Sequence, residues 1–270
     1  MLLCTLVGCS ATQPRHSERR IEPASAAQAA QPVITPSDGF DVELDAQGWS
    51  KAGGLRYLEL VSGGSERSAA LPLVIVIHGL GDKPSRSWLD LIDPNTHARL
   101  IVPEAPRPYM NGFAWFDYGA SHQAPEHLAA GIRGATDSLA RLIEQVQRAY
   151  HRDERVVVTG FSQGGMLSYA LALLRPDLVR VAIPISGMLP LPLWPTRNAG
   201  GQAPRIQALH GTADRVVPFE ADRQLSERLR ALQFAAELTP FARTGHTITQ
   251  SMREAVRSAL AEILPWQPLR

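Results

Sequence analysis

A serine between glycines stands where an apolar run of the sequence meets a helical stretch. Ser162 belongs to Gly-Phe-Ser-Gln-Gly (160–164), which follows the β-branched run 155–159 and precedes the apolar stretch 166–174. A serine in this G-x-S-x-G context sits on a tight turn from strand to helix, where its hydroxyl is exposed above the sheet. The N-terminus of the helix also stabilises developing negative charge. A turn that only packs is the alternative, but this position favours a nucleophile that attacks a carbonyl carbon.

Two side chains later in the sequence supply the base and the orienting acid that a serine hydroxyl needs. Asp214 follows the apolar run 206–209, and His246 follows the expected last strand, 236–241. On a doubly wound α/β domain the nucleophile, the acid and the histidine occur in this order along the chain. A loop aspartate is often only a turn former, and a lone histidine is often a surface residue. The His-Gly and Val-Val-Pro residues that flank Asp214 favour the catalytic interpretation.

Other titratable residues fit these roles less well. His210 precedes Asp214 and so breaks the order of the triad, which indicates a structural role. Asp137 and Asp177 lie within or beside expected helices rather than after strands. His78 stands before a glycine-rich turn, where we expect it to brace the loop.

The backbone is expected to stabilise the negative oxygen that forms when the serine attacks. His-Gly-Leu-Gly-Asp (78–82) follows the apolar run 73–77, where a fold of this kind places one oxyanion donor. The N–H groups of Leu80 and Gln163 should converge on that oxygen, and one such donor is typically worth ~3–4 kcal/mol. A phosphate cradle is the alternative for this glycine-rich segment, but the segment lacks the G-K-[ST] ending of one.

Two apolar segments near these motifs are candidates for a substrate pocket. One is the aromatic-rich loop 109–118, and the other is the proline-stiffened stretch 186–194. Either can be plain packing, but their position beside the elbow suggests that the substrate brings a hydrophobic tail. The candidate pocket residues are Trp115, Phe116, Met188 and Leu189.

The elements that must position these residues alternate along the chain. Short β-branched runs, typical of parallel strands covered on both faces, are separated by amphipathic helical stretches. The runs are 73–77, 100–102, 155–159, 181–185 and 206–209, and the helical stretches are 126–151, 164–174, 219–232 and 247–263. This alternation predicts one α/β domain over residues 39–270, with a mostly parallel central sheet, helices on both faces and no large cap domain.

Charge and cysteine content exclude several classes of protein. The formal net charge is +1, so the chain lacks the basic excess of a nucleic-acid-binding protein. Only two cysteines occur, Cys4 and Cys9, which excludes a disulfide framework and a cysteine-based metal site for the fold. We therefore expect no metal ion, no cofactor and no nucleic-acid partner.

The N-terminus indicates export and a lipid anchor. Leu-Val-Gly-Cys (6–9) resembles a bacterial lipobox, so residues 1–8 would end a signal segment and Cys9 would be lipidated and anchor the protein to a membrane. Residues 9–38 are poor in large apolar groups and are expected to form a disordered tether. The segment lacks a basic region, which a start codon assigned too far downstream explains. The expected location is the cell envelope, on the outer membrane facing the periplasm, or the cytoplasm if residues 1–8 are not a signal.

Taken together, the motifs from residue 71 onward resemble the phospholipase/carboxylesterase family of α/β-hydrolases, which includes acyl-protein thioesterases. The matching segments, in the order of the family, are His-Gly-Leu-Gly-Asp (78–82), Trp-Phe-Asp (115–117), Gly-Phe-Ser-Gln-Gly-Gly (160–165), Ser-Gly-Met-Leu-Pro (186–190), His-Gly-Thr-Ala-Asp-Arg-Val-Val-Pro (210–218) and Gly-His (245–246). The resemblance implies the α/β-hydrolase fold, with the triad and the oxyanion donors named above. It also implies hydrolysis of carboxylic esters or thioesters without a cofactor.

Departures from the family and competing functions bear on the substrate. An envelope enzyme seldom meets S-acylated cytosolic proteins, so small acyl esters of short or medium chain, or lysophospholipids, are expected before protein thioesters. A peptidase of the same fold is one alternative, although such peptidases usually add a propeller or cap, and none fits here. A catalytically silent lipoprotein that binds a ligand is the other, and the intact triad argues against it.

Overall fold

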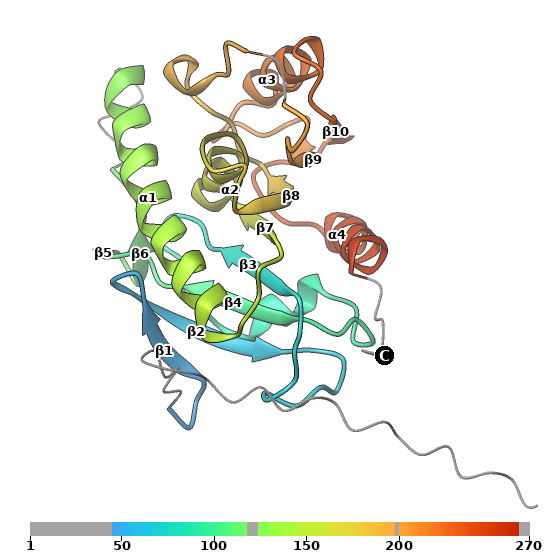
Figure 1. Ribbon diagram of the computed structural model, residues 1–270. Helices are drawn as coiled ribbons and strands as arrows, with labels where there is room; N and C mark the ends of the chain where they lie inside the picture. The colour runs from blue at the N-terminus through green and yellow to red at the C-terminus, as the bar shows by residue number, and fades with distance from the viewer. Residues whose placement is uncertain (1–44, 118–123, 198–199, 265–270) are drawn as a thin grey trace, which may run out of the picture. The chain divides into compact units, whose positions relative to one another are not determined.

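An eight-stranded sheet lies at the centre of the part of the chain that the structure describes, residues 45–117, 124–197 and 200–264 (Figure 1). The structure is a computed structural model, and all these residues belong to the unit Gln31–Arg270. In spatial order the strands are β1 (Trp49–Ala52), β2 (Leu55–Val61), β4 (Arg99–Pro103), β3 (Leu73–Ile77), β7 (Val156–Phe161), β8 (Val179–Ile185), β9 (Arg205–Gly211) and β10 (Ala236–Phe241). Strand β2 pairs antiparallel with β1 and β4, and every other pairing in this sheet is parallel. The predicted mostly parallel sheet is therefore confirmed.

The predictions for the N-terminal region lie outside the described residues. They are the signal segment 1–8, the tether 9–38 and the lipidation of Cys9. Among the residues that are described, no helix combines the length and the apolar character needed to cross a membrane.

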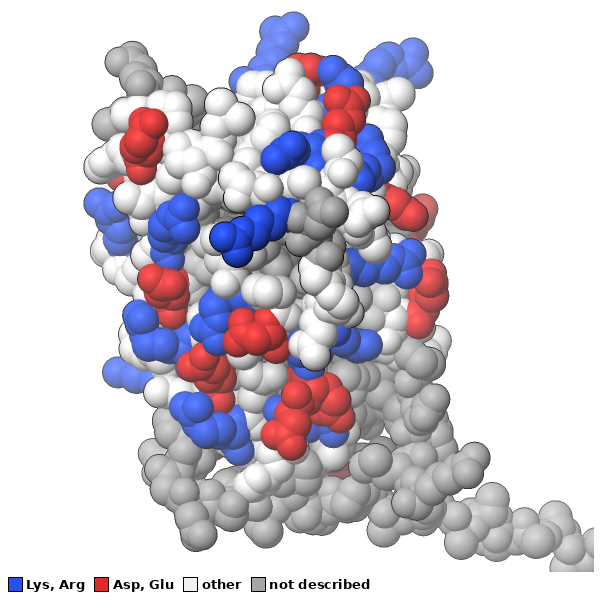
Figure 2. All heavy atoms as spheres, turned by 45° about the horizontal axis from the view of Figure 1, so that its top comes forward, with Lys and Arg blue, Asp and Glu red and all other residues white. Residues whose placement is uncertain are grey.

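On the face of the molecule that Figure 2 shows, basic and acidic side chains are interspersed.

Helices cover both faces of the sheet, as predicted. One face packs against α1 (Pro125–Ala149), α2 (Gln163–Leu174) and α3 (Phe219–Ala231). The other packs against α4 (Gln250–Ile263) and the short 3₁₀ helix η1 (Arg86–Leu91). Helix α2 is buried over most of its length because it packs on β7 and β8 and also against α1. The apolar character of its sequence on all sides is the consequence of that double coverage.

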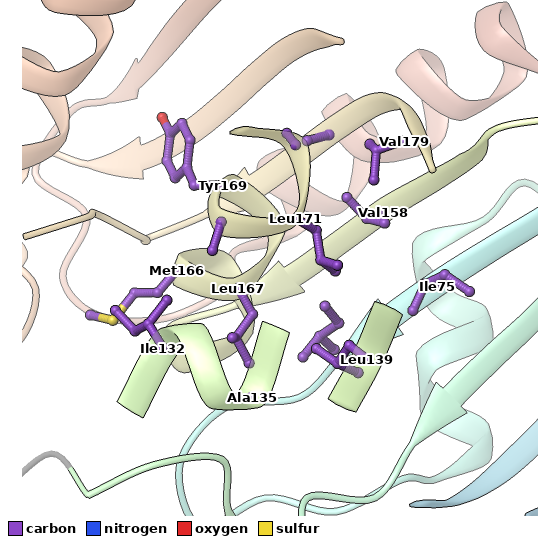
Figure 3. Packing of buried hydrophobic residues seen from close by; sticks show 14 of the residues in the cluster. Ile75, Ile132, Ala135, Leu139, Val158, Met166, Leu167, Tyr169, Leu171 and Val179 are labelled. Atoms are coloured by element: carbon purple, nitrogen blue, oxygen red, sulfur yellow. The ribbon is translucent and has the colours of Figure 1, made fainter. Parts of the chain in front are cut away.

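Strand β3 shows why the parallel strands are apolar without interruption. Ile75 and Ile77 pack into the core beneath α1 and α2, whereas Val74 and Val76 pack into the core beneath α4. Successive side chains of a strand point to opposite faces, so a strand covered on both sides needs an apolar residue at every position. Figure 3 shows the first of these cores, in which Ile75 and residues of α1 and α2 gather.

A two-stranded hairpin occupies part of the segment that was predicted to be an aromatic-rich loop. It is formed by β5 (Arg107–Tyr109) and β6 (Gly112–Ala114), which pair antiparallel. Strands of three residues with a proline and a glycine carry little local β signal. The hairpin is instead held by tertiary contacts, which involve the candidate site.

Candidate active site

Ser162 lies on a sharp turn between β7 and α2. Its backbone has φ 58° and ψ −115°, a conformation that a side chain with a Cβ adopts only at a cost. The turn is this tight because β7 and α2 both press on the end of β3: a Cβ added to Gly160 would lie 2.5 Å from the carbonyl oxygen of Ile77. A Cβ added to Gly164 would overlap the same oxygen. Glycine is required at both positions, as the motif predicts.

The three side chains predicted to form a triad meet at the carboxyl ends of the parallel strands. His246 Nε2 lies 2.9 Å from Ser162 Oγ, and His246 Nδ1 lies 2.7 Å from Asp214 Oδ2. The ring of Phe161 packs beside the imidazole, with 4.7 Å between ring centroids. One imidazole thus bridges a hydroxyl and a carboxylate that come from distant parts of the sequence.

The Asp214 carboxylate is buried and held by its own loop. Its Oδ1 accepts hydrogen bonds from the backbone N–H groups of Val216 and Val217, each at 2.9 Å. The N–H of Ala213 donates to the carbonyl of Thr244 at 2.9 Å, which ties this loop to the loop that carries His246. With Oδ1 fixed by the backbone, Oδ2 is left to face the imidazole of His246.

The loop predicted to supply an oxyanion donor passes directly beside the serine. A Cβ added to Gly79 would lie 3.4 Å from the Cβ of Ser162. Gln163 is the first residue of α2, so its N–H is among the four at the start of a helix that have no partner within it. This placement is the one that the oxyanion assignment of Leu80 and Gln163 needs, and the assignment itself stays a prediction.

The β5–β6 hairpin fixes the shape of that loop. The N–H of Gly81 donates to the carbonyl of Phe113 at 2.8 Å, and the N–H of Phe113 donates to the carbonyl of Asp82 at 3.0 Å. Gly81 itself has a φ of 75°, in the left-handed region. The hairpin is therefore a support for the site rather than a separate feature of the surface.

His78 braces the same loop from below. It is fully buried, its Nε2 accepts a hydrogen bond from the N–H of Ala105 at 3.1 Å, and its Nδ1 lies 2.8 Å from the carbonyl oxygen of Gly79. Burial lowers the pKa of His78, with smaller opposing contributions from Gly79 and Asp82. A neutral ring with its proton on Nδ1 satisfies both bonds, which agrees with the structural role predicted for it.

The side chain of Gln163 has a role that the sequence analysis missed. Its Oε1 accepts from the N–H of Trp115 at 3.0 Å and its Nε2 donates to the carbonyl of Phe116 at 2.9 Å. The indole N–H of Trp115 donates to the carbonyl of His78 at 3.0 Å. The buried amide therefore fastens the segment 115–116 to the turn that carries Ser162, through contacts between residues 47 or more positions apart.

The four candidate pocket residues divide into two groups. Trp115 and Phe116 line a cavity of about 340 Å³ together with α1 residues that include Gly131, and the three triad candidates are not among its lining residues. Leu189 is buried, and Met188 is half-buried against the same core; neither lines this cavity. The assignment of these residues to a substrate pocket remains a prediction.

The competing titratable residues lie away from Ser162 or point elsewhere. Asp177 forms an ion pair with Arg175, and Asp137 is exposed on α1. His210 is fully buried, and its two nitrogens face Asp222 and the carbonyl of Val217. Within the described ranges, no group of three or more His, Cys, Asp or Glu side chains is arranged to hold a metal ion.

Comparison with known sequences gives a match over most of the chain. The sequence profile of the Phospholipase/Carboxylesterase family matches residues 59–264. Lysophospholipase-like protein 1 of Mus musculus is 27% identical over 223 residues, which cover 76% of this chain and 91% of the mouse protein. Acyl-protein thioesterase 1 of Mycosarcoma maydis is 28% identical over 218 residues, which cover 71% of this chain and 90% of the fungal protein.

Solved structures share the fold. The crystal structure of esterase PE8 superimposes with a TM-score of 0.65 at 24% identity, covering 78% of this chain and 99% of that one. Zea mays acyl-protein thioesterase 2 superimposes with a TM-score of 0.59 at 24% identity, covering 77% and 99%. At these identities the similarity establishes the arrangement of helices and strands, and the chemistry must be argued from the site.

Proposed function

Because the chain belongs to the phospholipase/carboxylesterase family and has the α/β-hydrolase fold, we propose that it hydrolyses carboxylic esters through an acyl-enzyme intermediate on Ser162. The observation that carries the proposal is the chain of contacts from Ser162 Oγ to His246 Nε2 at 2.9 Å and from His246 Nδ1 to Asp214 Oδ2 at 2.7 Å. Nucleophile and base lie within hydrogen-bonding reach, and a third group orients the base.

Each side chain has one part in the proposed reaction. His246 takes the proton of the Ser162 hydroxyl as its oxygen attacks the ester carbonyl, and then gives that proton to the leaving alcohol or thiol. Water, activated by the same imidazole, then cleaves the acyl-enzyme and restores the serine. Asp214 holds the tautomer of His246 that has its proton on Nδ1, and it stabilises the charged ring that forms.

The negative oxygen of the tetrahedral intermediate is placed between the two backbone donors. In the proposed complex the N–H groups of Leu80 and Gln163 bind this oxygen, on the side where the loop 78–82 passes Ser162. Because the hairpin and His78 hold that loop from two sides, the donors are fixed before the substrate arrives. Such preorganisation is the usual source of electrostatic stabilisation in acyl transfer.

We propose small acyl esters with short or medium chains as substrates, with lysophospholipids and thioesters as the further members of the same class. The names of the two relatives, a lysophospholipase-like protein and an acyl-protein thioesterase, support this range. The aromatic segment 115–116, which the side chain of Gln163 fastens beside the turn that carries Ser162, supports an apolar acyl group. No cofactor enters the reaction.

Labelling with a fluorophosphonate, run beside turnover of p-nitrophenyl esters of increasing chain length, tests the proposal. We expect label on wild type and none on Ser162→Ala, with kcat in that variant lower by about 10⁴-fold or more. Esterase activity that survives in folded Ser162→Ala would mean that another residue is the nucleophile. Folded wild type that neither labels nor turns over any ester would instead support the ligand-binding alternative.

A further inference from the structure

A second line of polar side chains is buried behind the carboxylate of Asp214. The hydroxyl of Tyr169 on α2 donates to Asp222 Oδ1 on α3 at 2.5 Å, and Asp222 Oδ2 lies 2.7 Å from Nδ1 of His210 on β9. All three side chains are completely buried. Figure 3 shows Tyr169 among the apolar residues of the core, with its hydroxyl pointing out of that cluster.

The contacts of His210 determine where its protons lie. Its Nε2 is 2.9 Å from the carbonyl oxygen of Val217, which can only accept, so Nε2 carries a proton. Its Nδ1 faces a carboxylate oxygen, so an ionised Asp222 requires a proton there as well. Burial lowers the pKa of His210, but the hydrogen bond and the charge of Asp222 outweigh burial and raise it. Burial raises the pKa of Asp222 as well, and the hydrogen bond and charge of His210 and the hydrogen bond from Tyr169 oppose that rise. Because the Asp222 carboxylate faces a donor at each oxygen and His210 faces an acceptor at each nitrogen, the geometry favours an imidazolium paired with a carboxylate.

The pair of His210 and Asp222 contacts the proposed triad at Asp214. His210 Nε2 lies 3.5 Å from Asp214 Oδ2, the same oxygen that faces His246. Val217 forms a second link, because its carbonyl faces His210 while its N–H donates to Asp214 Oδ1. His210 thus acts on Asp214 both through its charge and through the loop that holds the carboxylate.

We propose that His210 and Asp222 are positioning residues, which balance part of the negative charge of Asp214 and so set the pH range in which His246 acts as a base. The proposal rests on the proposed ester hydrolysis. Neither residue touches the reacting atoms, and both act through Asp214. The histidine that the sequence analysis assigned to structure would then tune the reaction as well.

The groups that act on this pair come from three elements and one loop. Asp222 on α3 and Asp214 in the loop after β9 are the charged groups that act on His210. Tyr169 on α2 donates to Asp222, and burial raises the pKa of Tyr169 well above its ordinary value, with Asp222 adding to that rise and Arg230 opposing it. Tyr169 therefore remains a hydrogen-bond donor throughout the range of an activity assay.

Asp222→Asn changes the charge of the pair while keeping its shape. The amide oxygen can accept from Tyr169, and the amide N–H can donate to His210 Nδ1, so His210 becomes neutral with its proton on Nε2. Asp214 then loses a compensating charge at 3.5 Å, which favours the protonated form of its other partner, His246. The acidic limb of the kcat/KM profile, which reports protonation of the base, should move to higher pH by about half a unit to one unit.

Two further variants make the test specific. Asp177→Asn is the matched control, since it makes the same acid-to-amide change in an ion pair at the far end of α2, and it should leave the limb in place. Tyr169→Phe removes one donor from the Asp222 carboxylate and weakens the ion pair. It should move the limb in the same direction as Asp222→Asn by a smaller amount, and it replaces that variant in the test if Asp222→Asn does not fold.

The possible outcomes separate this inference from the function on which it rests. If wild type neither labels nor turns over esters, the proposed function fails first. If wild type is active and folded Asp222→Asn has the wild-type limb, or Tyr169→Phe has it where Asp222→Asn is unfolded, the pair is structural only and the inference is overturned. A shift in the predicted direction, with KM at the plateau unchanged, supports it.

Discussion

Two buried ionic clusters lie near opposite edges of the same sheet and contain nearly the same groups. At the amino end of β4, Arg99 pairs with Glu59, and Tyr150 donates its hydroxyl to that glutamate. Near the carboxyl end of β9, His210 pairs with Asp222, and Tyr169 donates to that aspartate. In both clusters a basic side chain and a carboxylate are buried, and a tyrosine hydroxyl donates to that carboxylate.

The two clusters differ in the type of basic side chain and in the other groups that this side chain contacts. In the first cluster the cation is an arginine, a side chain that keeps its charge in proteins. The other contacts of Arg99 are structural, because it donates to the carbonyls of Arg67 and Ala69 and lies 3.7 Å from the centre of the Tyr150 ring. His210 can lose its charge, and the next group beyond it is Asp214. The same chemistry thus secures the fold at one edge, and in our proposal it adjusts a reaction at the other.

The largest expected effect comes from neutralising Asp214, the acid at which the second cluster meets the proposed triad. In Asp214→Asn the amide oxygen can still accept from the loop N–H groups, so its N–H group faces His246 Nδ1. The imidazole must then carry its proton on Nε2, toward Ser162, and cannot act as a base. We expect kcat to fall by about 10⁴-fold with little change in the unfolding midpoint, measured by ester turnover and thermal melting. Near-normal turnover would show that Asp214 is not the orienting acid.

Glu59→Gln is the corresponding change in the cluster of Arg99. It should lower the stability of the fold and leave kcat nearly unchanged. It leaves the buried charge of Arg99 without its carboxylate, which typically costs about 3–5 kcal/mol. Urea unfolding should show that loss, while kcat per folded molecule, normalised by fluorophosphonate labelling, stays within about twofold of wild type. A fall in kcat with unchanged stability would mean that the cluster of Arg99 affects the reaction and not only the fold.

Side chains whose positions follow from local pattern were predictable, and contacts that depend on distant partners were not. Ser162, Asp214 and His246 each follow an apolar run in a fixed chain order, and the structure brings all three together. Glu59 lies in an alternating strand that resembles one with a solvated face, yet it is buried because Arg99, 40 positions away, meets it. No feature of the sequence around Glu59 signals that pairing.

The supports of the site escaped prediction for the same reason. The β5–β6 hairpin has almost no strand signal of its own and exists because its backbone bonds to the loop 78–82. The amide of Gln163 finds its partners in a segment 47 or more positions earlier in the chain. The sequence could place His210 outside the triad by order alone, but only coordinates could show that Asp222 and Tyr169 stand behind it.

The smallest expected effect is a difference in the pH dependence of stability between the two clusters. Because the pKa of His210 is raised in the folded state, its contribution to stability is complete below the unfolded value of about 6.5. That contribution is lost as pH rises through the folded value. The unfolding free energy of wild type minus that of His210→Gln should therefore fall with pH above about 6.5, by at most about 1.4 kcal/mol per unit. The same difference for Glu59→Gln should stay level from about pH 6 to 9, because that pair contains no histidine, the side chain that changes its charge in this range. Urea unfolding of the three proteins across that range measures both slopes. A level line for His210→Gln would mean that His210 is already neutral in the folded protein, which would remove the charge that distinguishes its cluster from that of Arg99.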